Sequence, residues 1–243
     1  MAITPYREAV RVHSSLLADI EKRCLIWMAR RMPGAVNSDH LTLLAGLAML
    51  GAGLCYWHGS AATLLAANGL LLVNWFGDSL DGTLARVRRQ ERPRYGFYVD
   101  HVLDVIGIFF IMAGLILGGH MSALTGGGFL VAYYLLMIEI ALATHAVGTF
   151  RISFWKFGPT ELRILLGIGT LQLLRSGVVT LAGHSLLLFD VGGICGIAGL
   201  VYAFVASAVT NTRTLYRMEP LPKRGKNVSI PQLPMPNSQM EHS

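Results

Sequence analysis

The sequence predicts an all-α polytopic membrane protein, with six transmembrane helices preceded by an amphipathic helix. Three observations lead to this fold class. The 243 residues are 53% hydrophobic and only 14% charged, whereas a soluble domain carries about 25% charged residues. Apolar stretches of membrane-spanning length recur along the chain, and the basic residues gather between alternate pairs of those stretches.

Six stretches are apolar over roughly the 20 residues that a transmembrane helix requires. They cover about 41–58, 60–77, 99–118, 127–149, 161–182 and 186–211. The chain therefore divides into an N-terminal segment (1–36), a six-helix transmembrane domain (37–215) and a C-terminal tail (216–243).

The basic residues predict the orientation of these helices. Nineteen of the 20 Lys and Arg residues lie in 7–31, 86–94, 151–163 and 213–226, and the exception is Arg175 in the fifth stretch. With six spans and the N-terminus inside, all four regions face the cytoplasm, as the positive-inside rule requires. This distribution accounts for the net charge of +6 without nucleic acid. The short chain suggests a bacterial cytoplasmic membrane.

The two flanking segments have different characters. In residues 7–31, apolar side chains recur at helical spacing among basic ones, a pattern typical of a helix lying in the cytoplasmic membrane interface. The stripe consists of Leu17, Ile20, Cys24, Trp27 and Met28. The tail is rich in proline and polar residues, which predicts disorder.

Four aspartates carry the strongest chemical signal. Asp78 and Asp81 are three residues apart at the end of the second span, and Asp100 and Asp104 are four residues apart at the start of the third. Each spacing places both carboxylates on one face of a helix. The short connection makes the two helices antiparallel neighbours, so all four carboxylates are expected to converge between them.

Four carboxylates close together near the membrane repel one another and require neutralisation. Arg86 can neutralise only one of them. Hard divalent cations take several oxygen ligands, and two of them balance four carboxylates. A two-metal site of this kind serves displacement at phosphorus. The oxygen ligands favour Mg²⁺ or Mn²⁺.

The residues around these acids complete a pattern, D-x2-D-G-x2-A-R-x9-G-x3-D-x3-D, from Asp78 to Asp104. It resembles the signature of the CDP-alcohol phosphotransferase (phosphatidyltransferase) family at all eight fixed positions, a low false-positive risk for a motif. The six-span layout and the N-terminal helix also look like this family.

The resemblance implies a role for each matching residue. Asp78, Asp81, Asp100 and Asp104 would hold two metal ions, and Asp104 would also be the general base. The CDP site would be lined or supported by Gly82, Ala85, Arg86 and Gly96. An upstream P-N-x-x-T element is matched only by Thr42, because Asp39 stands where the asparagine is expected. A homodimer is also implied.

Two further features resemble the choline and ethanolamine phosphotransferase branch. His101 directly follows the third aspartate, and Phe157-Gly-Pro-Thr-Glu161 precedes the fifth span. They favour a CDP-aminoalcohol donor and a diradylglycerol acceptor. His101 is alternatively a hydrogen-bonding neighbour of the acids, and Glu161 and Arg163 either support the site or begin a helix. Arg151 and Lys156 either bind phosphate or anchor the cytoplasmic loop.

Two alternatives remain open from the sequence. The first is a phosphatidyltransferase that uses CDP-diacylglycerol and a small polar alcohol. The second, an ion-coupled transporter, is disfavoured because the acids cluster at one membrane face, whereas transporter sites lie near the midplane. Glu139 lies in the middle of the fourth span, where an acid is either functional or hydrogen-bonded to another helix.

Overall fold

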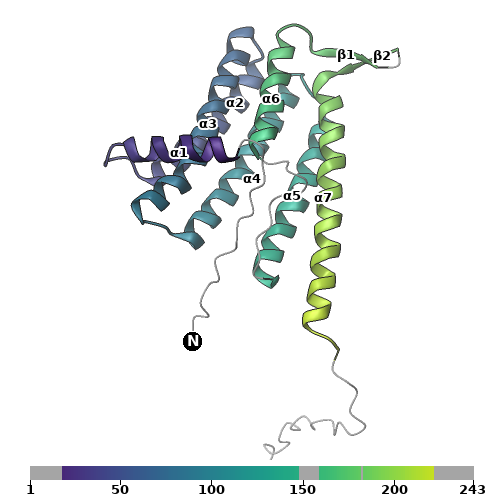
Figure 1. The fold of residues 1–243 in the computed structure, drawn as a ribbon. Helices are drawn as coiled ribbons and strands as arrows, with labels where there is room; N and C mark the ends of the chain where they lie inside the picture. Colours follow the sequence, from purple (N-terminus) through teal and green to yellow (C-terminus); the bar gives the residue numbers. More distant parts are fainter. Residues whose placement is uncertain (1–17, 148–158, 182, 222–243) are drawn as a thin grey trace, which may run out of the picture.

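A computed structural model describes residues 18–147, 159–181 and 183–221. This part of the chain forms a helical bundle with one β-hairpin (Figure 1). The helices are α1 (Ala18–Arg31), α2 (Ser38–His58), α3 (Ala61–Arg88), α4 (Pro93–Leu117), α5 (Ala123–Val147), α6 (Pro159–Leu173) and α7 (Leu188–Met218), and the strands are β1 (Val178–Leu181) and β2 (His184–Leu187).

Local sequence signals set the ends of α2 and α3. Asn37 caps α2 by accepting a hydrogen bond from the His40 backbone N–H, and the His40 side chain accepts one from the Asn37 N–H in return. Gly59 ends α2 with a φ of 70°, a left-handed conformation that favours glycine. Ser60 then caps α3, so the two helices form a tight antiparallel hairpin.

Close packing joins α2 to α4 and α3. A side-chain carbon on Gly53 would collide with the backbone carbonyl of Phe110, and one on Gly114 would collide with that of Gly53. One on Gly77 would lie 2.6 Å from the Leu41 carbonyl oxygen. Small residues allow such approach between helix backbones, and they hold α3 and α4 at fixed positions on either side of α2.

The helix α1 lies across the bundle, packed on α3 (Figure 1). Its Leu25 and Ala29 are buried in a cluster with Leu41, Leu80 and Leu84. Of the stripe predicted from periodicity, Met28 packs on this cluster, but Cys24 and Trp27 are exposed. The face toward the bundle is therefore rotated from the predicted one, because small Ala29 fits against α3 where Trp27 does not. Interfacial placement of α1 stays a prediction.

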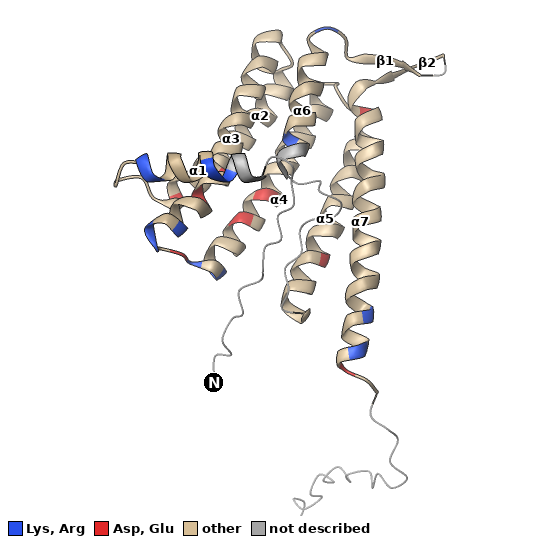
Figure 2. Cartoon of the chain, viewed as in Figure 1, with Lys and Arg blue, Asp and Glu red and all other residues tan. Residues whose placement is uncertain are grey.

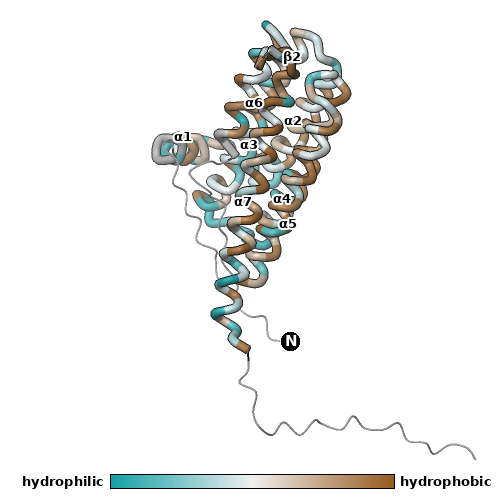
Figure 3. Tube along the Cα trace, turned by 90° about the vertical axis from the view of Figure 1, so that its right-hand side faces the viewer, coloured by the Kyte–Doolittle hydropathy of each residue, from teal (hydrophilic) through white to brown (hydrophobic). Residues whose placement is uncertain are grey.

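Among the described residues, four helices are long and apolar enough to cross a membrane, namely α2, α4, α5 and α7. Hydrophobic positions recur along much of the bundle (Figure 3). The helix α3 has 28 residues but bears Asp78, Asp81 and two arginines, Arg86 and Arg88, in its second half. The helix α6 has only 15 residues, fewer than a span requires. An integral membrane protein is thus supported, whereas the count of six spans stays a prediction.

The fifth predicted span, 161–182, is wrong in its second half. The helix α6 ends at Leu173, and residues 178–181 pair antiparallel with residues 184–187, with Val178 opposite Leu187. The β-branched run Val178–Thr180 favours a strand, and Gly183 adopts a φ of 82° at the turn. The predicted all-α class is therefore incomplete, because the fold also contains this β-hairpin. Arg175 lies beyond α6, not within a span.

The remaining boundaries differ by a few residues. The helix α4 begins at Pro93, a residue favoured at the first helical position, so Gly96 is helical. The helix α5 begins at Ala123 and includes Gly126–Gly128. The helix α7 continues to Met218, beyond the predicted start of the tail at 216. Residues 222–243 lie outside the described part.

Candidate active site

A cavity of about 1560 Å³ lies between α3 and α4 on one side and α5, α6 and α7 on the other. All four motif aspartates line it. The acidic positions gather on the parts of α3 and α4 that lie near α1 (Figure 2). The two aspartate pairs therefore share one cavity, although α3 and α4 each pack mainly on α2 rather than on each other. Convergence of the four carboxylates on metal ions stays a prediction.

Asp81 is the most deeply placed of the four, with 6% of its surface exposed. The Thr42 hydroxyl donates to its Oδ2 at 2.7 Å, and the Gly82 backbone N–H donates to its Oδ1. Thr42 is on α2, so this bond ties the acid to a neighbouring helix. Thr42 therefore serves the site by orienting a carboxylate.

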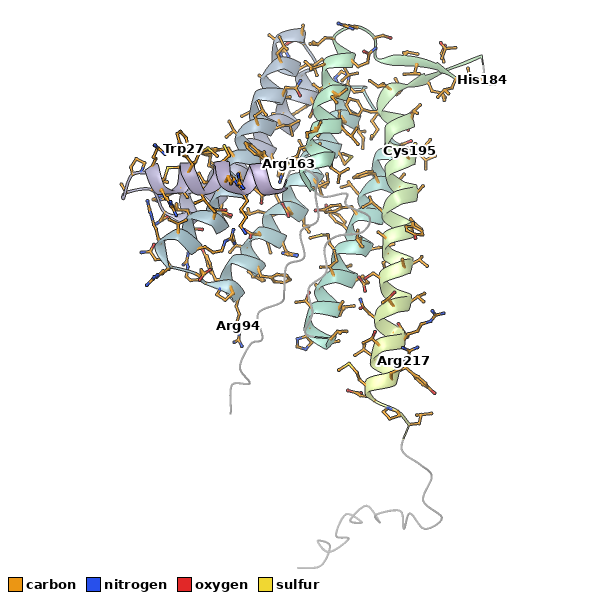
Figure 4. All side chains as sticks on the ribbon, in the orientation of Figure 1. Trp27, Arg94, Arg163, His184, Cys195 and Arg217 are labelled. Atoms are coloured by element: carbon orange, nitrogen blue, oxygen red, sulfur yellow. The ribbon has the colours of Figure 1, made fainter. Side chains whose placement is uncertain are left out.

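Asp78 forms an ion pair across the cavity. Arg163 Nη2 on α6 donates to Asp78 Oδ2 at 2.6 Å. Arg163 lies within the bundle, whereas Arg94 and Arg217 project away from it (Figure 4). The sequence left two interpretations of Arg163 open, namely support of the site or the start of a helix. The ion pair with Asp78 favours support of the site.

Asp100 and Asp104 lie on the cavity side of α4, with His101 between them. The His101 Nδ1 atom is 2.8 Å from the Phe97 carbonyl oxygen of the same helix, and its ring lies against the Phe97 ring at 4.0 Å between centroids. These contacts orient the imidazole along α4. They agree with the interpretation of His101 as a neighbour of the acids.

Gly82, Ala85, Arg86 and Gly96 also line the cavity. A side-chain carbon on Gly96 would meet nothing within 4 Å, and one on Gly82 would meet only the end of Arg86 at 3.4 Å. These glycines are therefore not required for helix packing, unlike Gly53 and Gly114. The open space beside them is the space that a ligand needs. The exposed Arg86 donates to the Thr83 hydroxyl at 3.1 Å.

The remaining predicted residues lie apart from the acids or outside the described part. Asp39 lines the same cavity and an adjoining one of about 390 Å³, and it pairs with Arg92, with both side chains exposed. Arg151 and Lys156 lie outside the described residues. Glu161 is in the first turn of α6, but its side chain also lies outside the described part.

The donor chemistry at this cavity fits divalent cations, since four carboxylates from two helices line it. The four carboxylates do not converge on a single point, however. Within 18–147, 159–181 and 183–221, no three His, Cys, Asp or Glu side chains form a group that could hold a metal ion. Asp78 in particular is engaged by Arg163. These residues thus suit a metal site. The ion pair between Arg163 and Asp78 would have to break before Asp78 could bind a metal ion.

Sequence reasoning missed Tyr133. This residue is on α5 and lines the cavity opposite the acids. Asp104, Arg163 and Asp78 line the same cavity. No sequence signal marked it, because an aromatic residue in an apolar span is usually part of the packing.

Glu139 lies outside the site. Asn211 Nδ2 on α7 donates to Glu139 Oε1 at 2.7 Å, and Ser207 Oγ lies 3.2 Å from the same amide. The acid is buried between α5 and α7. This supports the second alternative for Glu139, a hydrogen bond between helices.

This chain is similar to known proteins in both sequence and fold. The profile of the CDP-alcohol phosphatidyltransferase family matches residues 36–209. The archaetidylinositol phosphate synthase of Methanothermobacter thermautotrophicus is 34% identical over 122 residues, which are 47% of this chain and 59% of that protein. The chain thus spans less than two thirds of that relative.

The fold is similar to the crystal structure of Mycobacterium tuberculosis phosphatidylinositol phosphate synthase with CDP-DAG bound. The TM-score is 0.54 at 20% identity, covering 82% of this chain and 94% of that one. The family profile covers most of the chain, which argues against the transporter alternative. With the family profile matching 36–209, the chain belongs to the CDP-alcohol phosphatidyltransferase family.

Proposed function

We propose that the protein transfers a phosphatidyl-type group from a CDP-linked lipid to a polar alcohol and releases CMP. One observation carries this proposal. The motif acids line a cavity that continues from a polar end into an apolar one, so a charged diphosphate and a hydrocarbon chain fit in the same space.

The apolar end supports a lipid substrate. From Asp104, the lining continues along α4 to Leu115, eleven residues or about 16 Å away. At that end it includes Met121 and Phe189. This depth accommodates much of an acyl chain, while the diphosphate stays beside the aspartates.

The comparisons favour the lipid as the donor. The archaeal relative is by name an archaetidylinositol phosphate synthase, and the mycobacterial structure holds CDP-DAG. We infer that CDP-diacylglycerol or an ether-linked equivalent is the donor. The acceptor is then a small polar alcohol, and a phosphorylated inositol is the first to test.

Asp78, Asp81, Asp100 and Asp104 would hold the two divalent cations, Mg²⁺ or Mn²⁺. When bound, these ions neutralise the diphosphate and the charge that develops on it during transfer. Thr42 and the Gly82 N–H keep the Asp81 carboxylate oriented. Arg163 then offers its guanidinium to an anionic group of a substrate, once Asp78 no longer occupies it.

The chemistry requires one base. Asp104 takes the proton of the acceptor hydroxyl. The hydroxyl oxygen forms a bond to the lipid-side phosphorus, and the bond from that phosphorus to the CMP oxygen breaks. The site binds and orients both partners, and no covalent enzyme intermediate is required.

The test is CMP release by the purified full-length protein with Mg²⁺, using a panel of CDP-linked donors and acceptors. Asp104→Asn should lose at least about 10³-fold in kcat, because the base is removed. The control is Asp190→Asn, in the first turn of α7, where the acid accepts only from the Ser122 N–H among its described contacts. Wild-type-like turnover by Asp104→Asn would refute the assignment.

A second candidate donor is a CDP-aminoalcohol, with diradylglycerol as the acceptor. The Asp100–His101 dipeptide and residues 157–161 favour it. In that reaction the acceptor would occupy the apolar end of the cavity. CMP release from CDP-ethanolamine and diacylglycerol, with none from CDP-diacylglycerol, would select it over the first proposal.

The arrangement in the membrane is also a proposal. The basic clusters support cytoplasmic termini and a cytoplasmic active site, as expected for a bacterial inner-membrane enzyme that takes up a water-soluble substrate. A homodimer is proposed from the family resemblance alone. Cross-linking in native membranes would test the dimer, and protease access to the two termini would test the orientation.

A further inference from the structure

The strongest unassigned feature is Tyr133, on the α5 wall of the cavity. Within the part of the chain that the structure describes, the predicted site residues come from α2, α3, α4 and α6, so Tyr133 would bring a fifth helix to the site. Tyr133 lines the same cavity as Asp104, Asp78 and Arg163. Its phenol therefore shares one open space with the proposed base and the ion pair.

The neighbouring Tyr134 has a different role. Its hydroxyl donates to the Val105 carbonyl oxygen at 3.1 Å and so joins α5 to α4. The two rings contact each other edge to face, with centroids 6.1 Å apart. Adjacent positions on one helix therefore hold one phenol used in packing and one directed into the cavity.

We propose that Tyr133 contacts the substrate, donating a hydrogen bond from its hydroxyl to a non-bridging oxygen of the phosphoryl group under attack. This inference rests on the proposed function. A phenol is neutral at physiological pH, so it adds a donor among carboxylates without adding charge.

The hydrogen bond would matter most in the transition state. While the new P–O bond forms and the bond to CMP breaks, negative charge grows on the phosphoryl oxygens, and a fixed donor stabilises it. The acceptor proton goes to Asp104, and Tyr133 keeps its own proton throughout. Removal of the hydroxyl should therefore lower kcat more than it raises KM.

The experiment compares Tyr133→Phe with Tyr134→Phe in the full-length protein. For Tyr133→Phe, kcat for CMP release should fall about 10–100-fold with donor KM changed less than about threefold. Tyr134→Phe should lower thermal stability but retain kcat per folded molecule. Equal kcat for wild type and Tyr133→Phe, or equal losses of kcat in both variants, would overturn the proposal.

A second readout does not depend on turnover. In protein labelled with 3-fluorotyrosine, the resonance absent from Tyr133→Phe belongs to Tyr133. It should shift on addition of CDP-diacylglycerol with Mg²⁺, while the Tyr134 resonance stays in place. If wild type releases no CMP yet this resonance shifts, the proposed reaction fails and the contact stands. A resonance that does not move overturns the contact.

Discussion

Arg163 on α6 forms an ion pair with Asp78 on α3, with 2.6 Å between Nη2 and Oδ2. The two residues are 85 positions apart, and the pair closes one side of the cavity. Asp78 is also the first acid of the family motif. The guanidinium therefore occupies one of the carboxylates to which a divalent cation is proposed to bind.

This arrangement predicts that Arg163 competes with the metal. Arg163→Gln should tighten Mn²⁺ binding about 3–10-fold, equivalent to the ~1 kcal/mol expected for a partly exposed ion pair. Electron paramagnetic resonance of free Mn²⁺ measures the affinity directly. Arg217→Gln, which changes an exposed arginine at the far end of α7, is the control and should leave it unchanged. Unchanged or weaker binding by Arg163→Gln would contradict the competition.

Turnover should require Thr42, because its hydroxyl donates a hydrogen bond to Asp81. Thr42→Val removes the donor at 2.7 Å from a buried carboxylate, and such a bond to a charged group contributes about 1.5–3 kcal/mol. We expect kcat to fall about 10–100-fold, while Thr42→Ser retains most of the activity. Steady-state CMP release measures both. The matched control is Thr63→Val, since Thr63 bonds only with Ser60 at the start of α3 among its described contacts.

Glu139 should affect stability rather than turnover. Glu139→Ala removes the acceptor of Asn211 between α5 and α7 and is expected to cost about 1–3 kcal/mol, because a buried amide loses its partner. Glu139→Gln keeps an acceptor and should cost less. Thermal unfolding in detergent gives the stability. A large loss of kcat without a change in melting temperature would instead place Glu139 in the reaction.

His120 should make the fold sensitive to acid. It lies between α4 and α5, where burial lowers its pKa below the usual 6.5 and a hydrogen bond to the Tyr56 backbone acts in the opposite direction. The unfolded chain therefore binds a proton more readily than the folded protein, so stability rises with pH in this range. The contribution is complete above about pH 6.5 and is lost as pH falls through the lower folded-state value.

Melting temperatures between pH 5 and 8 measure this effect. His120→Phe should lessen the decline at low pH, because no imidazole has to be protonated there. His58→Gln, which changes an exposed histidine nearby, should retain the wild-type decline. A His120→Phe profile that parallels wild type would show that other groups cause the acid sensitivity.

The sequence by itself predicted the family and the four acids that line one cavity. The reason is that carboxylates at i, i+3 and i, i+4 share a face of their helix, and the short connection keeps the adjoining ends of the two helices close in space. Apolar length likewise predicted most of α2, α4, α5 and α7. These signals lie within short stretches of sequence, so helix geometry alone is sufficient to predict their structure.

Tertiary structure decided what local patterns cannot express. Nothing near Arg163 in sequence points to Asp78, and nothing distinguishes Tyr133 from Tyr134, because each partner comes from another helix. The apolar run after Leu173 looked like a span, but the β-branched residues there pair as a hairpin once α6 ends. The apolar stripe of α1 was likewise decided by which side chains fit against α3. Close packing between distant segments made each of these choices.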